Sequence, residues 1–234
     1  KKSIRRSTKA IIIYPFESQD LHELLEKAHA KGISLIYLDA VQSYEIPGTY
    51  IISNNEQEGF KAGQLLAQAM GNEGEAVMLN TSSDNPKALD LENGFQKALH
   101  QYPDINIVNL FNCNGQRENT KKTLQDILAA HPNIKGVFTA CPETTAAAVE
   151  SIRGLNREIQ VVGFNHTDET LQFINSGQLY GLVSLKSFDM GYEAVRTAVS
   201  LSLGQNVLPQ IDLGFDIYTG DDTDGTGNSN SPFS

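Results

Sequence analysis

Residues 75–108 read EAVMLNTSSDNPKALDLENGFQKALHQYPDINIV, and this stretch indicates the fold. It begins with a short apolar run at 75–80, which is typical of a buried parallel strand. The polar cluster at 81–86 has the composition of a loop that caps a helix. Apolar residues recur at mostly helical spacing over 88–102, until a proline ends the helix and a second strand begins. We predict a strand–helix–strand crossover in a parallel sheet, where ligands bind at the carboxyl ends of the strands.

The same rhythm of strand and helix extends along the rest of the chain. Apolar and β-branched runs predict further strands at 9–15, 34–40, 49–54, 105–111, 135–140, 160–165, 180–185 and 210–218. Amphipathic segments predict helices at 20–31, 56–70, 119–130, 144–152, 168–175 and 189–203. This alternation predicts an α/β protein with mostly parallel sheets. The tail at 219–234 is rich in Gly, Ser, Asn and Asp, so we expect it to be flexible.

Composition excludes several classes of function. The chain has 234 residues, enough for one large domain or two smaller lobes. Its net charge of -10 argues against a nucleic-acid partner, which requires clustered Lys and Arg. The sequence contains no Ser-His-Asp order, no His and Cys at metal-binding spacing and no phosphate-binding loop. We therefore expect no enzymatic activity and no cofactor. The two cysteines, Cys113 and Cys141, fit a reducing compartment, one disulfide, or two unpaired thiols.

Many short motifs, in this order, give the chain a family resemblance. They are KAIIIYP (9–15), GISLIYLDA (32–40), SNNEQEGFKAGQLLAQ (53–68), GNEGEAVML (71–79), ENGFQKALHQYPDINIV (92–108), AAHPNIKGVFTA (129–140), IQVVGFNHTDETLQFINSGQLYGLVSL (159–185) and DMGYEAVRTAV (189–199). Together they resemble the type I periplasmic-binding-protein-like family. The chain is more closely similar to its sugar-binding branch, the soluble receptors of ABC importers related to ribose- and galactose-binding proteins. The resemblance covers nearly everything from residue 9 to about residue 218.

The resemblance implies two Rossmann-like lobes with a ligand cleft between them. The first lobe would combine 1–53 with 189–210, and the second would combine 54–185 with 211–218. The chain would cross between the lobes three times, near 53–55, 185–187 and 211–213. The family also opens with a strand, a helix and a second strand ahead of the segment that matches KAIIIYP. We therefore expect that the chain is a fragment, or that another segment or chain fills the gap beside that strand.

The resemblance also places the ligand-binding positions, at Asp39, Leu91, Gly115, Cys141, Asn165 and Leu185. The family has an arginine at the position of Leu91, a stacking aromatic near Gly115 and an asparagine at Cys141. It has an aspartate at Asn165 and a glutamine at Leu185. Only Asp39 keeps the family's polar type. Because each missing polar partner costs roughly 1–3 kcal/mol, we expect weak or no binding of ribose, galactose or glucose. The cleft would then take a less polar ligand or no small molecule.

Some candidate residues have simpler interpretations. Asp39 could be a helix or loop cap instead of a ligand for hydroxyl groups. Asn165 is the better ligand candidate of its loop, since His166 is more simply a surface residue or a helix cap. The family's strand order puts one strand between those of Cys113 and Cys141, which disfavours a disulfide. Buried, unpaired thiols are the favoured interpretation.

Three hypotheses for function follow from the resemblance. The first is an extracytoplasmic solute-binding protein that delivers a carbohydrate-like or less polar ligand to the membrane permease of an ABC importer. The second is a sensor domain whose partner is a membrane receptor kinase. The third is the effector domain of a transcription repressor. The motifs GNEGEAVML and AAHPNIKGVF are more similar to the transport branch, and the sequence has no helix-turn-helix.

Overall fold

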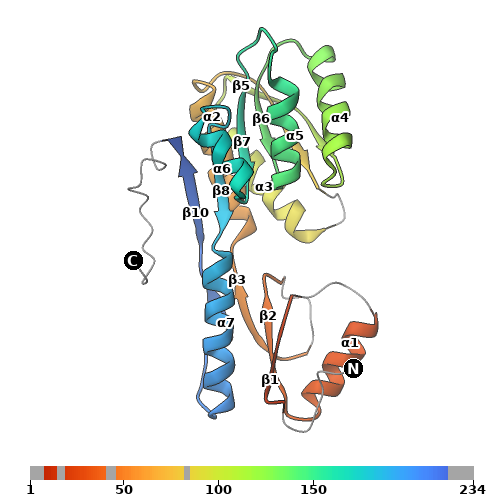
Figure 1. Cartoon of the computed structure of the whole chain (residues 1–234), viewed down its shortest axis with the longest axis vertical. Coiled ribbons are helices and arrows are strands. Elements are labelled where there is room, and N and C mark those ends of the chain that lie inside the picture. The colour runs from red at the N-terminus through yellow and green to blue at the C-terminus, as the bar shows by residue number, and fades with distance from the viewer. Residues whose placement is uncertain (1–7, 15–18, 41–45, 82–84, 221–234) are drawn as a thin grey trace. The chain divides into compact units, whose positions relative to one another are not determined.

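The computed structural model describes residues 8–14, 19–40, 46–81 and 85–220, so most of the expected tail lies outside the described part. The chain divides into two compact units (Figure 1). Unit 1 comprises Lys1–Asn54 and Leu185–Phe215, and unit 2 comprises Asn55–Ser184 and Asp216–Ser234. Each unit is built on its own sheet of largely parallel strands, and β2 of unit 1 and β4, β6 and β7 of unit 2 are apolar runs that are mostly buried.

Unit 1 has a four-stranded sheet with the order β1-β2-β3-β9, in which every pair is parallel. The strands are β1 (Ala10–Ile13), β2 (Ser34–Leu38), β3 (Thr49–Ile52) and β9 (Gln210–Asp212). Helices α1 (Gln19–His29) and α7 (Ser187–Ser202) cover the two faces (Figure 1). Leu35 and Tyr37 of β2 pack in the cluster of α1, whereas the alternate residue Ile36 packs in the cluster of α7.

Unit 2 has a six-stranded sheet with the order β10-β8-β7-β6-β4-β5. Its strands are β4 (Gly74–Asn80), β5 (Ile105–Asn112), β6 (Ile134–Thr139), β7 (Gln160–Phe164), β8 (Gly181–Leu185) and β10 (Phe215–Thr219). Its helices are α2 (Asn55–Ala69), α3 (Pro86–Leu99), α4 (Arg117–Ala130), α5 (Pro142–Ile152) and α6 (Asp168–Asn175). The crossover predicted from 75–108 is confirmed as β4, α3 and β5, with β4 and β5 paired in parallel.

Alternating side chains of the unit 2 strands face two helical layers. Val77 and Leu79 of β4 lie in a cluster with residues of α4, α5 and α6. On the other side of the sheet, Phe138 of β6 stacks on Phe95 of α3, with ring centroids 4.9 Å apart. Helices therefore cover both faces of the sheet, and the loops lie at the amino and carboxyl ends of its strands.

Helices α2 and α3 pack with their backbones in contact. A Cβ atom added at Gly59 of α2 would lie 1.9 Å from the carbonyl oxygen of Leu91. A Cβ atom added at Gly94 of α3 would lie 1.9 Å from the carbonyl oxygen of Glu56. Only glycine permits this approach, so the two helices form one rigid layer against the sheet.

The structure corrects two predicted boundaries. The strand predicted over 210–218 is two strands, β9 in the unit 1 sheet and β10 in the unit 2 sheet. The break occurs at Gly214, whose φ is 64° and whose N–H donates to Oδ1 of Asp212 at 2.9 Å. The helix predicted to continue to Tyr102 ends at Leu99, because the following residues form a turn in which the Tyr102 N–H bonds the Leu99 carbonyl. Within the described residues, no helix has both the length and the apolar character that crossing a bilayer requires.

Candidate ligand-binding site

Three loops converge at the carboxyl ends of three neighbouring strands of unit 2. They follow β4, β5 and β6 and contribute Thr81, Gly115 and Cys141. A Cβ atom added at Gly115 would lie 3.8 Å from Sγ of Cys141 and 3.9 Å from Cγ2 of Thr81. Gly115 has a φ of 65°, a left-handed conformation that suits glycine in a tight turn. The structure therefore brings together two of the predicted site positions, Gly115 and Cys141.

Asn80 positions the loop that follows β4. Its side chain is buried, and its Nδ2 donates to the carbonyl oxygen of Ala88 and to Oε2 of Glu92, each at 3.1 Å. Its Oδ1 accepts the backbone N–H of Thr81 at 2.8 Å. Asn85 then caps α3 by accepting the N–H of Lys87. Asn80 thereby ties the strand end to the first turns of α3, a role that the sequence analysis did not assign.

Cys141 caps the N-terminus of α5. Its thiol lies 3.4 Å from Oγ1 of Thr144, and its carbonyl oxygen accepts bonds from the hydroxyls of Thr144 and Thr145. Burial raises the pKa of the Cys141 thiol and that of the Cys113 thiol, so both are protonated at neutral pH. Both cysteines are unpaired; Cys113 is buried as expected, whereas Cys141 is partly exposed. Only Cys141 can present its sulfur to a ligand.

The loop after β7 holds a polar cluster. Asn165 has a φ of 62°, and its N–H donates to the carbonyl oxygen of Val183 at 2.8 Å. Nδ1 of His166 lies 2.8 Å from Oγ of Ser184, and the His166 ring lies 5.1 Å from the ring of Tyr218. The prediction that His166 caps a helix is wrong, because the N-cap residue of α6 is Thr167. The side chain of Thr167 accepts the N–H of Thr170. His166 is instead held in place by side chains of two other strands.

Two of the predicted positions carry apolar side chains that cannot bond a hydroxyl group. Leu91 is 4% exposed on α3, with its backbone against Gly59 of α2. Leu185 is partly buried and ends β8. Neither side chain belongs to the cluster formed by Thr81, Gly115 and Cys141.

Asp39 occupies the carboxyl end of β2 in unit 1. It is 7% exposed, and its N–H donates to the carbonyl oxygen of Ile51 at 2.8 Å. Its Oδ2 accepts a long hydrogen bond of 3.5 Å from the hydroxyl of Tyr14. Its φ is 45°, and such left-handed backbone is energetically unfavourable for a residue with a side chain. Unfavourable backbone conformations of this kind concentrate at ligand-binding positions.

The residues named in these loops carry hydrogen-bonding or weakly polar side chains. Across the described ranges, no group of three or more His, Cys, Asp or Glu side chains is arranged to hold a metal ion. The amide of Asn165, the ring of His166 and the carboxylate of Asp39 can donate to or accept from hydroxyl groups. Each of these groups can therefore bond a hydroxyl group by itself.

Comparison with known proteins shows what the chain is similar to. The sequence profile of the family described as periplasmic binding protein domain matches residues 2–206. The ribose import binding protein RbsB of Haemophilus influenzae is 23% identical over 206 residues, which cover 88% of this chain and 70% of RbsB. The D-apiose import binding protein of Actinobacillus succinogenes is 27% identical over 196 residues, which cover 82% of this chain and 63% of that protein.

A solved structure confirms the fold. A periplasmic solute-binding protein of an ABC transporter from Actinobacillus succinogenes, solved with bound D-allose, superposes with a TM-score of 0.88 at 23% identity. The match covers 94% of this chain and 80% of that one. The predicted α/β class with parallel sheets and the predicted resemblance to the sugar-binding branch are both confirmed.

Proposed function

The chain belongs to the periplasmic binding protein domain family, and we propose that it is an extracytoplasmic solute-binding protein of an ABC importer. Its ligand would be a small carbohydrate-like or less polar molecule, delivered to a membrane permease. The observation that carries the proposal is the match, over more than four-fifths of the chain, to proteins named as import binding proteins for ribose and D-apiose. The same names give no support to a sensor-kinase partner or to a repressor effector domain.

We assign the ligand contacts in unit 2 to the loops at the carboxyl ends of its strands. Asn165 would offer its amide to hydroxyl groups, and Ser184 would hold the ring of His166 so that its second ring nitrogen can bond the ligand. Cys141 and Gly115 would give the rest of this surface a small, weakly polar character. In unit 1, the carboxylate of Asp39 would accept hydrogen bonds from the ligand.

Isothermal titration with pentoses, hexoses and polyols tests the assignment. With the ligand that binds most tightly, we expect Asn165→Ala and Asp39→Ala each to raise Kd at least about fivefold, since a lost hydrogen bond to a buried partner costs roughly 1–3 kcal/mol. Asn109→Ala is the matched control, because Asn109 is an exposed amide on β5 whose Oδ1 accepts only the adjacent N–H in the described structure. Unchanged affinity in Asn165→Ala and Asp39→Ala would refute the assignment of these contacts.

A further inference from the structure

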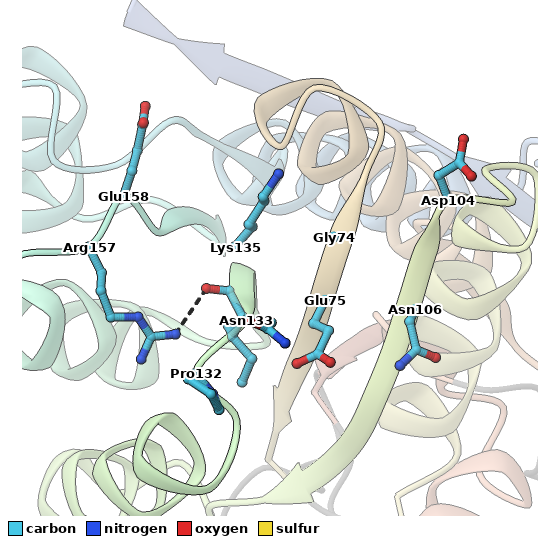
Figure 2. Close-up of a pocket in the computed structure, with 10 residues that line it drawn as sticks. Gly74, Glu75, Asp104, Asn106, Pro132, Asn133, Lys135, Arg157 and Glu158 are labelled. Atoms are coloured by element: carbon cyan, nitrogen blue, oxygen red, sulfur yellow. Dashed lines mark hydrogen bonds between the residues drawn. The ribbon is translucent and has the colours of Figure 1, made fainter.

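A pocket lies at the edge of the unit 2 sheet opposite to the candidate ligand-binding site. It has a volume of about 580 Å³ and opens at the amino ends of β4, β5 and β6 (Figure 2). We call it the amino-end pocket; its polar lining includes Glu75, Asp104, Asn106, Asn133, Arg157 and Glu158. The candidate site described above follows the carboxyl ends of the same strands. The two locations are therefore separated by the length of the sheet.

Glu75 is the central group of the amino-end pocket. It is the second residue of β4 and lies in register with Asn106 of β5 and Ile134 of β6. Figure 2 shows the side chains of Glu75 and Asn106 projecting to the same side from these neighbouring strands. Among the described residues, Oε2 of Glu75 is buried and has no hydrogen-bond donor. A buried carboxylate oxygen is costly unless a donor or a positive charge reaches it.

The cationic side chains of the pocket are engaged elsewhere. The guanidinium of Arg157 donates to the carbonyl oxygens of Leu128, His131 and Ile134 at 3.0, 3.3 and 3.2 Å. Arg157 therefore binds the carbonyl groups at the C-terminal end of α4, where a positive charge is favourable. Nζ of Lys135 lies 2.5 Å from Oε1 of Glu73. Neither cation is hydrogen-bonded to Glu75.

The remaining lining is acidic or neutral. Asp104 and Glu158 add two further carboxylates to that of Glu75. Asn106 and Asn133 add amide oxygens, which accept hydrogen bonds. An occupant that carries several N–H donors and a positive charge would satisfy Glu75.

We propose that the amino-end pocket binds an ammonium or guanidinium group, held by the carboxylate of Glu75 and by the side-chain oxygens of Asn106 and Asn133. The group could belong to a small amine or to a Lys or Arg side chain of a protein partner, since both present the same donors. The proposal does not depend on which solute the other edge of the sheet binds.

Titration of the ¹⁵N-labelled protein with guanidinium and with n-butylammonium, followed by NMR, tests the proposal. Sodium at equal ionic strength and neutral n-butanol serve as reference titrants. We expect saturable shifts of the backbone signals of Gly74, Glu75, Asn106 and Asn133 with the two organic cations only. Equal shifts with sodium, or no saturable shift at these residues, would overturn the proposal.

Variants localise the site. Glu75→Gln keeps the shape of the side chain and removes its charge, so we expect at least a tenfold rise in the Kd of both cations. Asn106→Ala, at an exposed amide, should weaken binding by a smaller factor without affecting the fold. Asp168→Asn is the charge-matched control, because Asp168 is exposed in the first turn of α6, beyond the carboxyl end of β7, and does not line the amino-end pocket; it should leave Kd unchanged. Equal affinity of Glu75→Gln and the unmodified protein would contradict the assignment.

A third pair of titrants separates the two sources of the cation. Capped Gly-Lys-Gly and Gly-Arg-Gly peptides are titrated into the ¹⁵N-labelled protein, with capped Gly-Ala-Gly as the reference. The shifts of the same backbone signals are measured. Saturable binding of the Lys or Arg peptide with the affinity of the free cation supports a protein partner's side chain. Binding of n-butylammonium or guanidinium without the peptides supports a small amine.

Discussion

Replacing Gly59 with alanine tests the contact between α2 and α3 most sharply. The added Cβ atom would lie 1.9 Å from the carbonyl oxygen of Leu91 and 2.8 Å from its carbonyl carbon. Both are backbone atoms of a helix, so no side-chain rotation can relieve the overlap and the helices must separate. Overpacking of this kind costs typically 1–3 kcal/mol and occasionally more, whereas the better helix propensity of alanine returns about 1 kcal/mol. Because the overlap is with backbone atoms, we take the upper value of about 3 kcal/mol for the cost, and we expect the free energy of unfolding of unit 2 to fall by about 2 kcal/mol.

Urea unfolding followed by circular dichroism measures this change, and hydrogen exchange of the α2 amides assigns it to unit 2. Gly191→Ala is the matched control in a helix, since a Cβ atom there would have nothing within 4 Å. It should stabilise unit 1 by about 0.5–1 kcal/mol. Gln68→Ala, at an exposed position of α2, should change the stability of unit 2 by less than about 0.5 kcal/mol. A Gly59→Ala protein as stable as the unmodified one, with the same dependence on urea, would refute the close packing.

Two further predictions concern ionisation. Hydrogen bonds from Arg117 and, second, from Lys121 lower the pKa of Glu150 to about 2, so its ion pairs stabilise the fold above about pH 4.5 and are lost as the pH falls toward 2. Glu150→Gln should therefore reduce the loss of stability between these pH values. Urea unfolding measured as a function of pH would contradict this if the variant lost stability in acid as the unmodified protein does. Because burial raises the pKa of both thiols, iodoacetamide at pH 8 should alkylate them more slowly than it alkylates a free thiol. The partly exposed Cys141 should react before the buried Cys113. Mass spectrometry that finds the reverse order would disprove the difference in exposure.

The sequence predicted the strand and helix order because that order depends on local patterns. Parallel strands covered on both faces must be apolar runs, and β4, β6 and β7 are such runs. The break between β9 and β10 could not be read from local hydrophobicity, since apolar residues continue on both sides of Gly214. The break depends on which sheet each half of the segment joins, and this is a long-range property.

The candidate site was predictable in part, for the same reason. The rule that ligands bind at the carboxyl ends of parallel strands indicated the loops of Gly115, Cys141 and Asn165. The contact of His166 with Ser184 and Tyr218 joins three distant segments, and no short spacing indicates it. The amino-end pocket was missed because the same rule directs attention to the opposite edge of the sheet.

The most direct test of the proposed function is a thermal-shift screen of the purified protein against pentoses, hexoses, polyols and nucleosides. A ligand that binds only the folded state raises its stability by about 2.7 kcal/mol at a hundredfold excess over Kd. We predict a clear rise in melting temperature with at least one carbohydrate-like or less polar molecule, smaller in Asn165→Ala and Asp39→Ala, and little or no rise with ribose, galactose or glucose. The absence of any shift across the screen would contradict the solute-binding function, and a large shift with one of those three sugars would contradict the proposed change in specificity.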